Sequence, residues 1–359
     1  MARTRVRKGM PSVALSKAEF MSLARQRFFD PAFDPLQKEI EKVLAAAWNG
    51  YHEYRKAPRT RRAGRGYADP NYQLSIDWLK AKEAIVRAEL TQKSARARSR
   101  ILLVNGSMRS DQSCPGEISK SWRLLEVARK VIEKERGFEV EVLDLSLLTS
   151  QYARQILPCK ACVSTAQPLC HWPCSCYPNH AMGQVNDWMN DIYPMWAAAH
   201  GVMIVTPVNW YQAPGGLKAM MDRLVCANGG NADPTSTSGK DPKKAKQIEM
   251  KGWDFPNHLA GRAFAAVVHG DAAGVETLRR ILVDWSKDMG LIPAGHAAQL
   301  DRYVGYYEPY ALGHEALDRD HAFQEETRNA ARALMQAVKM LRRGELAQPD
   351  ANLKEPRLK

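Results

Sequence analysis

The pattern of hydrophobic and polar residues divides the chain near residue 99. Before it, apolar residues such as Ile40 and Leu44 recur at helical spacing, and Ser16 stands where a helix N-cap is expected. The pattern predicts helices over 15–29, 34–56 and 73–100, with a Pro-, Gly- and Arg-rich loop at 57–72. We therefore expect a helical extension over residues 1–98.

After residue 99, short apolar runs alternate with amphipathic segments. Strands are predicted at 100–106, 138–146, 202–208, 261–271 and 291–298, and helices at 116–137, 185–201, 215–227, 274–290 and 315–345. Residues 228–260 are polar and Lys-rich without a clear period, so we interpret them as a long inserted loop. Strands alternating with helices indicate an α/β fold with a doubly wound, five-stranded parallel sheet. Such sheets bind ligands beyond the carboxyl ends of their strands.

Composition restricts the class of protein. The 359 residues are 45% hydrophobic, enough for one large or two ordinary domains. Mean hydropathy is −0.43, and without an apolar run of 18 residues we expect no membrane span. The basic start "MARTRVRKGM" lacks the apolar segment of a signal peptide, leaving an Arg-rich transit peptide as the alternative. Seven clustered cysteines do not form a secreted disulfide scaffold, so we expect a reducing, cytoplasmic compartment.

Most of the net charge of +13 lies at the N-terminal end. Residues 1–100 carry 22 Lys and Arg against 10 Asp and Glu, whereas the remaining residues carry 30 against 29. A basic patch can contact nucleic acid, but no aromatic platform or known nucleic-acid motif accompanies it. We favour a solvated helical arm that wraps the main domain or a second subunit, with nucleic acid as the alternative partner.

The loop after the first α/β strand, "NGSMRSDQSCPGEISKSWRLLE", has the composition of an anion site. It leads into a helix start, where unpaired N–H groups and the helix dipole favour a phosphate. Ser107, Ser119 and Ser121 can donate hydroxyl hydrogen bonds, and Arg109 can add a charge-assisted one. Neither the Gly-x4-Gly-Lys-Ser/Thr loop nor Gly-x-Gly-x-x-Gly is present. An ordinary capped helix is the alternative.

Two further strand ends carry unusual residues. "TPVNWYQAPGG" places Trp210 and Tyr211 just past a buried strand, where two large aromatic side chains either cap the core or flank a flat ring. "AVVHGDAAG" ends the next strand in His269 followed by glycine, which permits close approach of a ligand. A lone histidine in such a place is more often structural than catalytic. The three strand ends together are the candidate ligand site.

Four segments carry a resemblance to a known family. "NGSMRS…SKSWRLLE", "CKAC", "HGVMIVTPVNWYQAPGGLKAMMDRL" and "HGDAAG", in this order and spacing, resemble the flavodoxin-like NAD(P)H-dependent FMN reductase and quinone reductase family. The resemblance covers roughly residues 100–300 and implies a flavodoxin-like domain over 99–300, bound FMN and a homodimer. The extension 1–98, the insertion 228–260 and the C-terminal helical region 301–359 lie outside what it describes.

The resemblance also implies roles for individual residues. Around the FMN phosphate it places Ser107, Arg109, Ser119, Lys120 and Ser121. Ser119 stands ten residues after Arg109, farther than is usual in the family, so Ser113 is an alternative phosphate contact. Around the isoalloxazine ring it places Pro207, Val208, Asn209, Trp210 and Tyr211, with His269, Gly270 and Asp271 on the other side. Catalysis would be centred on the flavin, with His269 or Tyr211 as candidate proton donors to a quinone oxygen.

The function implied is an FMN-dependent oxidoreductase. NADPH or NADH would pass electrons through FMN to a small acceptor, which could be a quinone, a nitro or azo compound, a flavin or a protein. One alternative is a flavodoxin-like redox or binding module whose basic arm docks on a protein or nucleic acid. Another is an iron–sulfur flavoprotein in electron transfer.

The stretch "CKACVSTAQPLCHWPCSC" at 159–176 holds five of the seven cysteines. Zinc sites often use two separated Cys-x2-Cys pairs, and only one such pair is present. Iron–sulfur clusters need four thiolates, often in a compact run. We favour free thiols with a local structural role in a wall of the flavin site or of a dimer interface. An iron–sulfur cluster, zinc and a redox disulfide remain alternatives. The candidate ligands are Cys159, Cys162, Cys170, Cys174 and Cys176.

Overall fold

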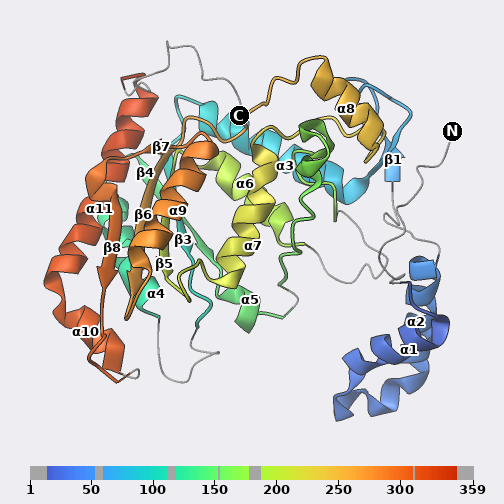
Figure 1. Ribbon diagram of the computed structural model, residues 1–359, viewed down its shortest axis with the longest axis horizontal. Helices are drawn as coiled ribbons and strands as arrows, with labels where there is room; N and C mark the ends of the chain where they lie inside the picture. Colours follow the sequence, from blue (N-terminus) through green and yellow to red (C-terminus); the bar gives the residue numbers. More distant parts are fainter. Residues whose placement is uncertain are drawn as a thin grey trace. The chain divides into compact units, whose positions relative to one another are not determined.

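The computed structural model describes residues 14–52, 60–110, 119–152, 154–177, 187–309 and 312–345 (Figure 1). These residues fall into two compact units. The first contains α1 (Lys17–Arg25) and α2 (Gln37–His52), and the second contains every later element. Among all the residues that the structure describes, no helix is both long and apolar enough to cross a membrane.

The first unit is a small helical hairpin. α1 begins with a capping box, in which Ser16 and Glu19 satisfy each other's backbone N–H groups, as the sequence predicted for Ser16. Two 3-10 turns (Gln26–Phe28 and Pro31–Leu36) lead into α2. Phe20 packs with Ile40 and Leu44 in a core of its own. The two predicted helices are confirmed.

The second unit starts with a hairpin that the sequence did not predict. Within the expected loop, β1 (Thr60–Arg62) pairs antiparallel with β2 (Gln73–Ser75). Ser75 then caps α3 (Ile76–Lys93). Ile85 of α3 is buried in the same core as the main sheet. The structure thus groups α3 with the α/β unit, whereas the sequence pattern grouped it with the N-terminal extension.

The main sheet has the flavodoxin-like strand order. It consists of β3 (Ser99–Asn105), β4 (Phe138–Asp144), β5 (Gly201–Pro207) and β6 (Ala263–Gly270), with β7 (Ile292–Pro293) and β8 (Gln299–Tyr303) at one edge. The order is β4-β3-β5-β6, and both β7 and β8 pair with β6. All these pairings are parallel. Counted along the chain this is the order 2-1-3-4-5, in which FMN binds where the strand order reverses.

The fifth strand position differs from the prediction. A single strand was expected at 291–298, but it breaks after Pro293 and resumes as β8. Gly295 has φ +102 and is followed by a 3-10 turn at His296–Ala298 (η6), which separates the two pieces. The charged sequence "QLDRY" of β8 concealed this strand.

Helices cover both faces of the sheet (Figure 1). One face packs against α3, α6 (Met189–Ala198), α7 (Gly215–Leu224) and α9 (Val275–Asp288). The other packs against α4 (Lys120–Glu133) and α11 (His321–Arg342). Shorter elements complete the unit: α5 (Leu147–Ser150), α8 (Pro242–Met250), α10 (Gly313–Arg319) and 3-10 turns at Cys162–Ser164, Gln167–Leu169 and Val225–Ala227.

Two helix predictions need correction. The segment 228–260 is not all loop, because Asp241 caps α8 through the backbone N–H groups of Lys243 and Lys244. The single helix predicted at 315–345 is two helices, α10 and α11. Asp320 lies between them and accepts a hydrogen bond from Phe323 N, which starts α11.

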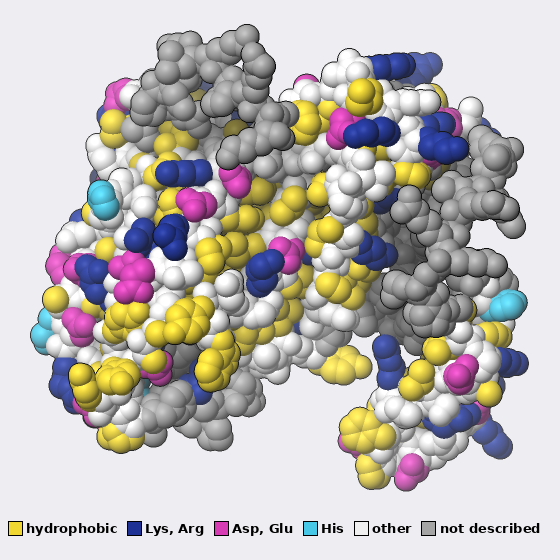
Figure 2. Space-filling model, in the orientation of Figure 1, with side chains coloured by type: hydrophobic (Ala, Val, Ile, Leu, Met, Phe, Trp, Pro, Cys, Tyr) yellow, Lys and Arg dark blue, Asp and Glu magenta, His cyan; other side chains and the backbone are white. Residues whose placement is uncertain are grey.

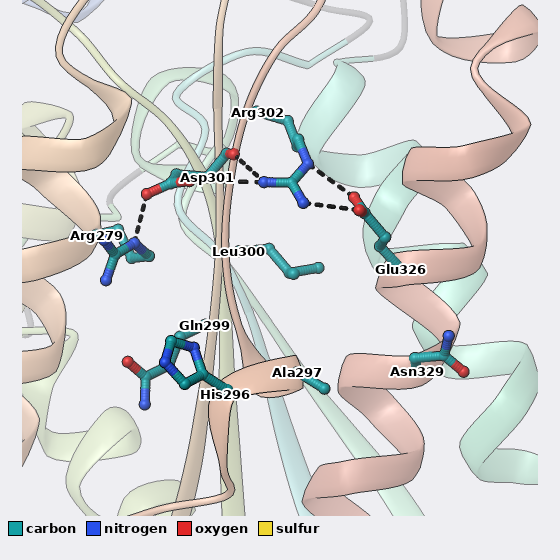
Figure 3. A pocket seen from close by; sticks show the side chains of 9 residues that line it. All are labelled: Arg279, His296, Ala297, Gln299, Leu300, Asp301, Arg302, Glu326 and Asn329. Atoms are coloured by element: carbon teal, nitrogen blue, oxygen red, sulfur yellow. Dashed lines mark hydrogen bonds and ion pairs between the residues drawn. The ribbon is translucent and has the colours of Figure 1, made fainter.

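Charged side chains tie down the outer edge of the sheet. Asp301 of β8 bonds Arg279 of α9, and Arg302 of β8 bonds Glu326 of α11 (Figure 3). A pocket of about 470 Å³ lies here, but its two guanidinium groups and two carboxylates already neutralise one another. Charges of this kind protect an edge strand from pairing with another chain. On the face shown in Figure 2, acidic and basic groups are likewise interspersed.

Candidate functional site

The three strand-end loops meet in one pocket. It has a volume of about 270 Å³ and lies between the carboxyl ends of β3, β5 and β6 and the start of α4. Eleven of the predicted site residues line it: Ser107, Arg109, Ser119, Lys120, Ser121, Pro207, Val208, Asn209, His269, Gly270 and Asp271, together with Met108. Ser113 lies outside the described residues. That these residues bind FMN stays a prediction at this point.

A second pocket of about 240 Å³ shares Arg109 and Ser119 with the first. Its lining includes Asn105 and Asp144, which the sequence reasoning missed. Asn105 donates to Asp144 Oδ1 at 2.7 Å and accepts from Ser107 N at 3.2 Å. Asn105 and Asp144 are the last residues of β3 and β4, so a polar residue closing an apolar strand was the available signal. Their bonds set the direction in which the β3–α4 loop leaves the sheet.

The start of α4 supplies an anion-binding geometry. Ser119 is its N-cap and accepts from Trp122 N at 3.1 Å. The first-turn residues Lys120 and Ser121 line the pocket, so the positive end of the helix dipole faces it. Lys120 also donates to Val304 O at 3.1 Å, which ties this helix start to the loop after β8. A phosphate group matches these donors in charge and in hydrogen-bonding type.

His269 is buried and paired with a serine. Its Nε2 lies 2.7 Å from Ser121 Oγ, and its Nδ1 has no partner among the described residues. Burial lowers the pKa of His269 to about 3, and the Lys120 ammonium adds to this effect. The imidazole is therefore neutral at physiological pH. A neutral imidazole is a weaker acid than an imidazolium, and the role of His269 or Tyr211 as proton donor to a quinone oxygen stays a prediction.

Two glycines let the strand ends pack closely around the pocket. A Cβ on Gly106 would lie 2.5 Å from Thr206 Oγ1, and one on Gly270 would lie 2.6 Å from Val208 Cγ1. Both separations are too short for any side chain. The sequence singled out Gly270 for close approach of a ligand, and the structure shows that a neighbouring strand end already needs the space.

Trp210 and Tyr211 form a strained turn beside the pocket. Asn209 and Gln212 exchange two backbone hydrogen bonds of 2.9 Å, and the residues between them have φ of +49 and +66. Positive φ at both central residues is the signature of a type I′ turn, where Asn and Gly are usual. Trp210 is 94% exposed and Tyr211 58% exposed. Neither lines the pocket, in contrast to the border position expected for both.

The cysteine segment lies at the other end of α7. The first turn of α7 packs against Met108, which lines the pocket, because a Cβ on Gly216 would lie 2.5 Å from Met108 Sδ. At the last turn of α7, by contrast, Cys226 Sγ donates a hydrogen bond to Arg223 O. Cys174 lies close enough to Cys226 to raise the pKa of the Cys226 thiol. None of the five cysteines lines either pocket. That this segment forms a wall of a flavin site or of a dimer interface stays a prediction.

Four thiols of that segment face one another. Cys162 interacts with Cys170 and Cys176, and Cys174 interacts with Cys176. Cys170 and burial raise the pKa of Cys162, against a smaller lowering by Cys176, and Cys176 and burial raise the pKa of Cys174. The Lys240 ammonium lies 3.7 Å from Cys162 Sγ.

The ordinary structural roles of this segment are also visible. His171 has both ring nitrogens bonded to hydroxyl groups, those of Ser175 at 2.5 Å and Thr237 at 2.9 Å, so it is satisfied without a metal. Trp172 N donates to Asn231 O at 2.9 Å. In the part of the chain that the structure describes, no group of three or more His, Cys, Asp or Glu residues is arranged to hold a metal ion.

The sequence is similar to those of known flavoproteins. A sequence model of the family described as NADPH-dependent FMN reductase matches residues 99–299. An iron-sulfur flavoprotein of Methanosarcina thermophila is 32% identical over 123 residues, which cover 34% of this chain and 50% of that protein. The chain thus spans half the length of this curated relative.

Solved structures align with the chain at lower identity. RosB, with bound 8-demethyl-8-formylriboflavin-5'-phosphate, aligns with a TM-score of 0.43 and 11% identity over 69% of this chain and 82% of that one. The apo form of an NADH:FMN oxidoreductase aligns with a TM-score of 0.37 and 15% identity over 70% of this chain and 92% of that one.

Proposed function

The chain belongs to the NADPH-dependent FMN reductase family, and on that premise we propose that it is an FMN-dependent oxidoreductase. It takes electrons from NADPH or NADH and passes them to a small acceptor such as a quinone, a nitro or azo compound, or a flavin. The observation that carries the proposal is the meeting of three strand-end loops, far apart in the chain, around one pocket at the reversal of strand order.

One half of the pocket suits the phosphate of FMN. The hydroxyl groups of Ser119 and Ser121, the first-turn N–H groups of α4 and the guanidinium of Arg109 are all donors. Among the residues lining this pocket the only carboxylate is Asp271, which is exposed. A dianionic phosphate therefore meets donors and positive charge without a buried carboxylate to repel it.

The other half suits a flat ring. The backbone from Pro207 to Asn209 is held in place, because Val208 N donates to His269 O at 2.8 Å. The glycine at position 270 lets the end of β6 pack closely against Val208, which lines the pocket. FMN supplies the hydride and electron chemistry when bound, and the protein supplies its binding, orientation and surroundings. Since His269 is neutral, we propose that the acceptor takes its protons from solvent at the open rim.

Two measurements test the proposal. The purified protein should show flavin absorbance or should bind added FMN with quenching of flavin fluorescence, and the loaded protein should oxidise NADPH or NADH when a quinone is present. Riboflavin, which lacks the phosphate, should bind more weakly than FMN. A protein that binds neither flavin and oxidises neither nicotinamide cofactor would contradict the proposal.

A second candidate is electron transfer through an iron–sulfur cluster. It is favoured by the description of the Methanosarcina relative as an iron-sulfur flavoprotein and by the interactions that join Cys162 to Cys170 and Cys176, and Cys176 to Cys174. The sulfur donors suit iron chemically. The raised pKa values of Cys162 and Cys174 and the lack of a metal-holding arrangement in the described residues oppose it. Iron and acid-labile sulfide analysis of anaerobically purified protein distinguishes the two functions.

A further inference from the structure

We propose that His269 is a positioning residue that fixes the direction of the Ser121 hydroxyl, so that this hydroxyl donates into the pocket to a bound phosphate ester. The proposal rests on the proposed function, since FMN is the phosphate ester concerned. It replaces the role of His269 as a proton donor with one in recognition of the anion.

The geometry starts from a buried contact between residues 148 apart in sequence. Ser121 Oγ and His269 Nε2 are 2.7 Å apart, and the side chains are buried where the second residue of α4 meets the end of β6. A hydrogen bond of this length joins the two groups, but its direction depends on which ring nitrogen carries the proton. A neutral imidazole has one N–H and one lone pair.

The other ring nitrogen settles that direction. Nδ1 is buried and has no partner among the described residues. If the proton were on Nδ1, a buried N–H would be left unpaired, and unpaired buried donors are rarer than unpaired acceptors. With the proton on Nε2, only a lone pair is left without a partner. The structure thus favours the form in which His269 Nε2–H donates to Ser121 Oγ.

The consequence reaches the pocket. When Ser121 Oγ accepts from His269, its own O–H remains available as a donor. Ser121 lines the same pocket as Arg109 and Lys120, at the positive end of α4. The hydroxyl hydrogen therefore points toward the place where an anion is favoured. The opposite direction would present oxygen lone pairs to the phosphate, which would repel it.

Two substitutions separate hydrogen bonding from packing. His269→Phe keeps a ring but removes the donor, and it should weaken FMN binding about tenfold while changing riboflavin binding by less than about twofold. His269→Gln keeps an N–H near the position of Nε2 and should restore most of the affinity. Ser121→Ala should weaken FMN binding about as much as His269→Phe does. The double variant should bind FMN no more weakly than either single variant.

A direct observation is available without any flavin. Nitrogen-15 NMR of histidine-labelled protein reports which ring nitrogen carries the proton. His200 is a matched internal standard, because its Nδ1 accepts from Arg100 N at 3.0 Å and its Nε2 lies 2.9 Å from Gln92 O, which requires the Nε2–H form. The His269 signals should match this pattern. His200→Gln is the control variant for flavin binding and should leave the affinity ratio of FMN to riboflavin unchanged.

The outcomes decide the proposal. An Nδ1–H form of His269, additive losses in the double variant, or equal weakening of FMN and riboflavin by His269→Phe would overturn it. If the protein binds neither flavin, the proposed function fails separately. The inference then stands or falls on the NMR result and on whether His269→Phe weakens the binding of inorganic phosphate, measured by calorimetry. Should His269→Phe not fold, His269→Gln and the wild-type NMR spectrum still provide the test.

Discussion

Arg223 and Asp187 form a fully buried ion pair, with their side chains 1% and 2% exposed and 2.5 Å between Nη2 and Oδ2. Arg223 lies in the last turn of α7, and Asp187 lies just before α6. The guanidinium also donates to Leu157 O at 2.7 Å, so the pair ties both helices to the segment that leads into the cysteines.

Removing one partner of this pair should be costly. Asp187→Ala leaves a buried guanidinium without its counter-charge, and we expect a loss of about 3–5 kcal/mol in the free energy of unfolding. The matched control is Asp222→Ala, which breaks the exposed pair with Lys218 and should cost less than about 1 kcal/mol. Urea denaturation of the three proteins measures both. Equal losses in the free energy of unfolding for Asp187→Ala and Asp222→Ala would mean that burial does not make the Arg223–Asp187 pair more important for stability.

Arg109 should discriminate between flavins. If its guanidinium contacts the phosphate, Arg109→Ala should weaken FMN binding about 10- to 100-fold and leave riboflavin binding nearly unchanged. Arg129→Ala is the control, because Arg129 also follows the pocket loop but pairs with Glu126 and Glu133 along α4. Fluorescence titration with each flavin gives the affinities. If Arg109→Ala weakened FMN and riboflavin binding by similar factors, Arg109 would not contact the phosphate.

Gly106 should not tolerate a methyl group. Gly106→Ala would bring Cβ within 2.5 Å of Thr206 Oγ1 and 2.9 Å of Leu217 Cδ2, and we expect a loss of about 1–3 kcal/mol. Gly215→Ala is the control, since a Cβ there meets nothing within 4 Å and alanine favours the helix that starts at this residue. Thermal unfolding should therefore show opposite shifts for the two variants. A Gly106→Ala protein as stable as the wild type would show that the strand ends can separate.

Stability should fall on mild acidification because of a buried histidine. Burial lowers the pKa of His200 to about 4, and Arg342 adds to the effect. Between this value and about 6.5 the unfolded chain binds a proton that the folded protein does not, so the folded state loses stability as pH falls through this range. The loss assigned to His200 is about 2–3 kcal/mol.

His200→Gln is the test of that pH dependence. The variant lacks the titrating group, so its unfolding free energy should fall less steeply between about pH 6.5 and pH 4. Denaturant unfolding at several pH values gives the two slopes, and the carboxylates contribute equally to both proteins. Parallel slopes would show that folding does not lower the pKa of His200.

The sequence located the strand ends that line the pocket better than it located the edges of the fold. Apolar runs ending in "NG", "TPV" and "HGD" located three strand ends, because parallel strands must bring such ends to one side of the sheet. The pairing of Ser121 with His269 was not predictable, since it depends on how α4 is set against β6. The turn at Trp210 and Tyr211 lacked the Asn or Gly that signals positive φ.

The missed elements share weak hydrophobic patterns. β1 and β8 are short and rich in charged residues, and in α8 only Ala245 is buried, so periodicity had little to detect. The junction between α10 and α11 was concealed because the amphipathic pattern continues across it, while the signal was a single capping aspartate. The roles of the N-terminal extension and of dimerisation remain predictions.

The exposure of Trp210 has an optical consequence. The chain has nine tryptophans, and among the described residues Trp210 is the one whose side chain is exposed rather than buried or half-buried. A small collisional quencher in solution therefore meets this indole first, while the emission of the interior indoles persists. The red side of the emission spectrum thus belongs mainly to the turn beside the pocket. It gives a label-free signal from the β5–α7 loop, whose residues Val208 and Asn209 line the pocket.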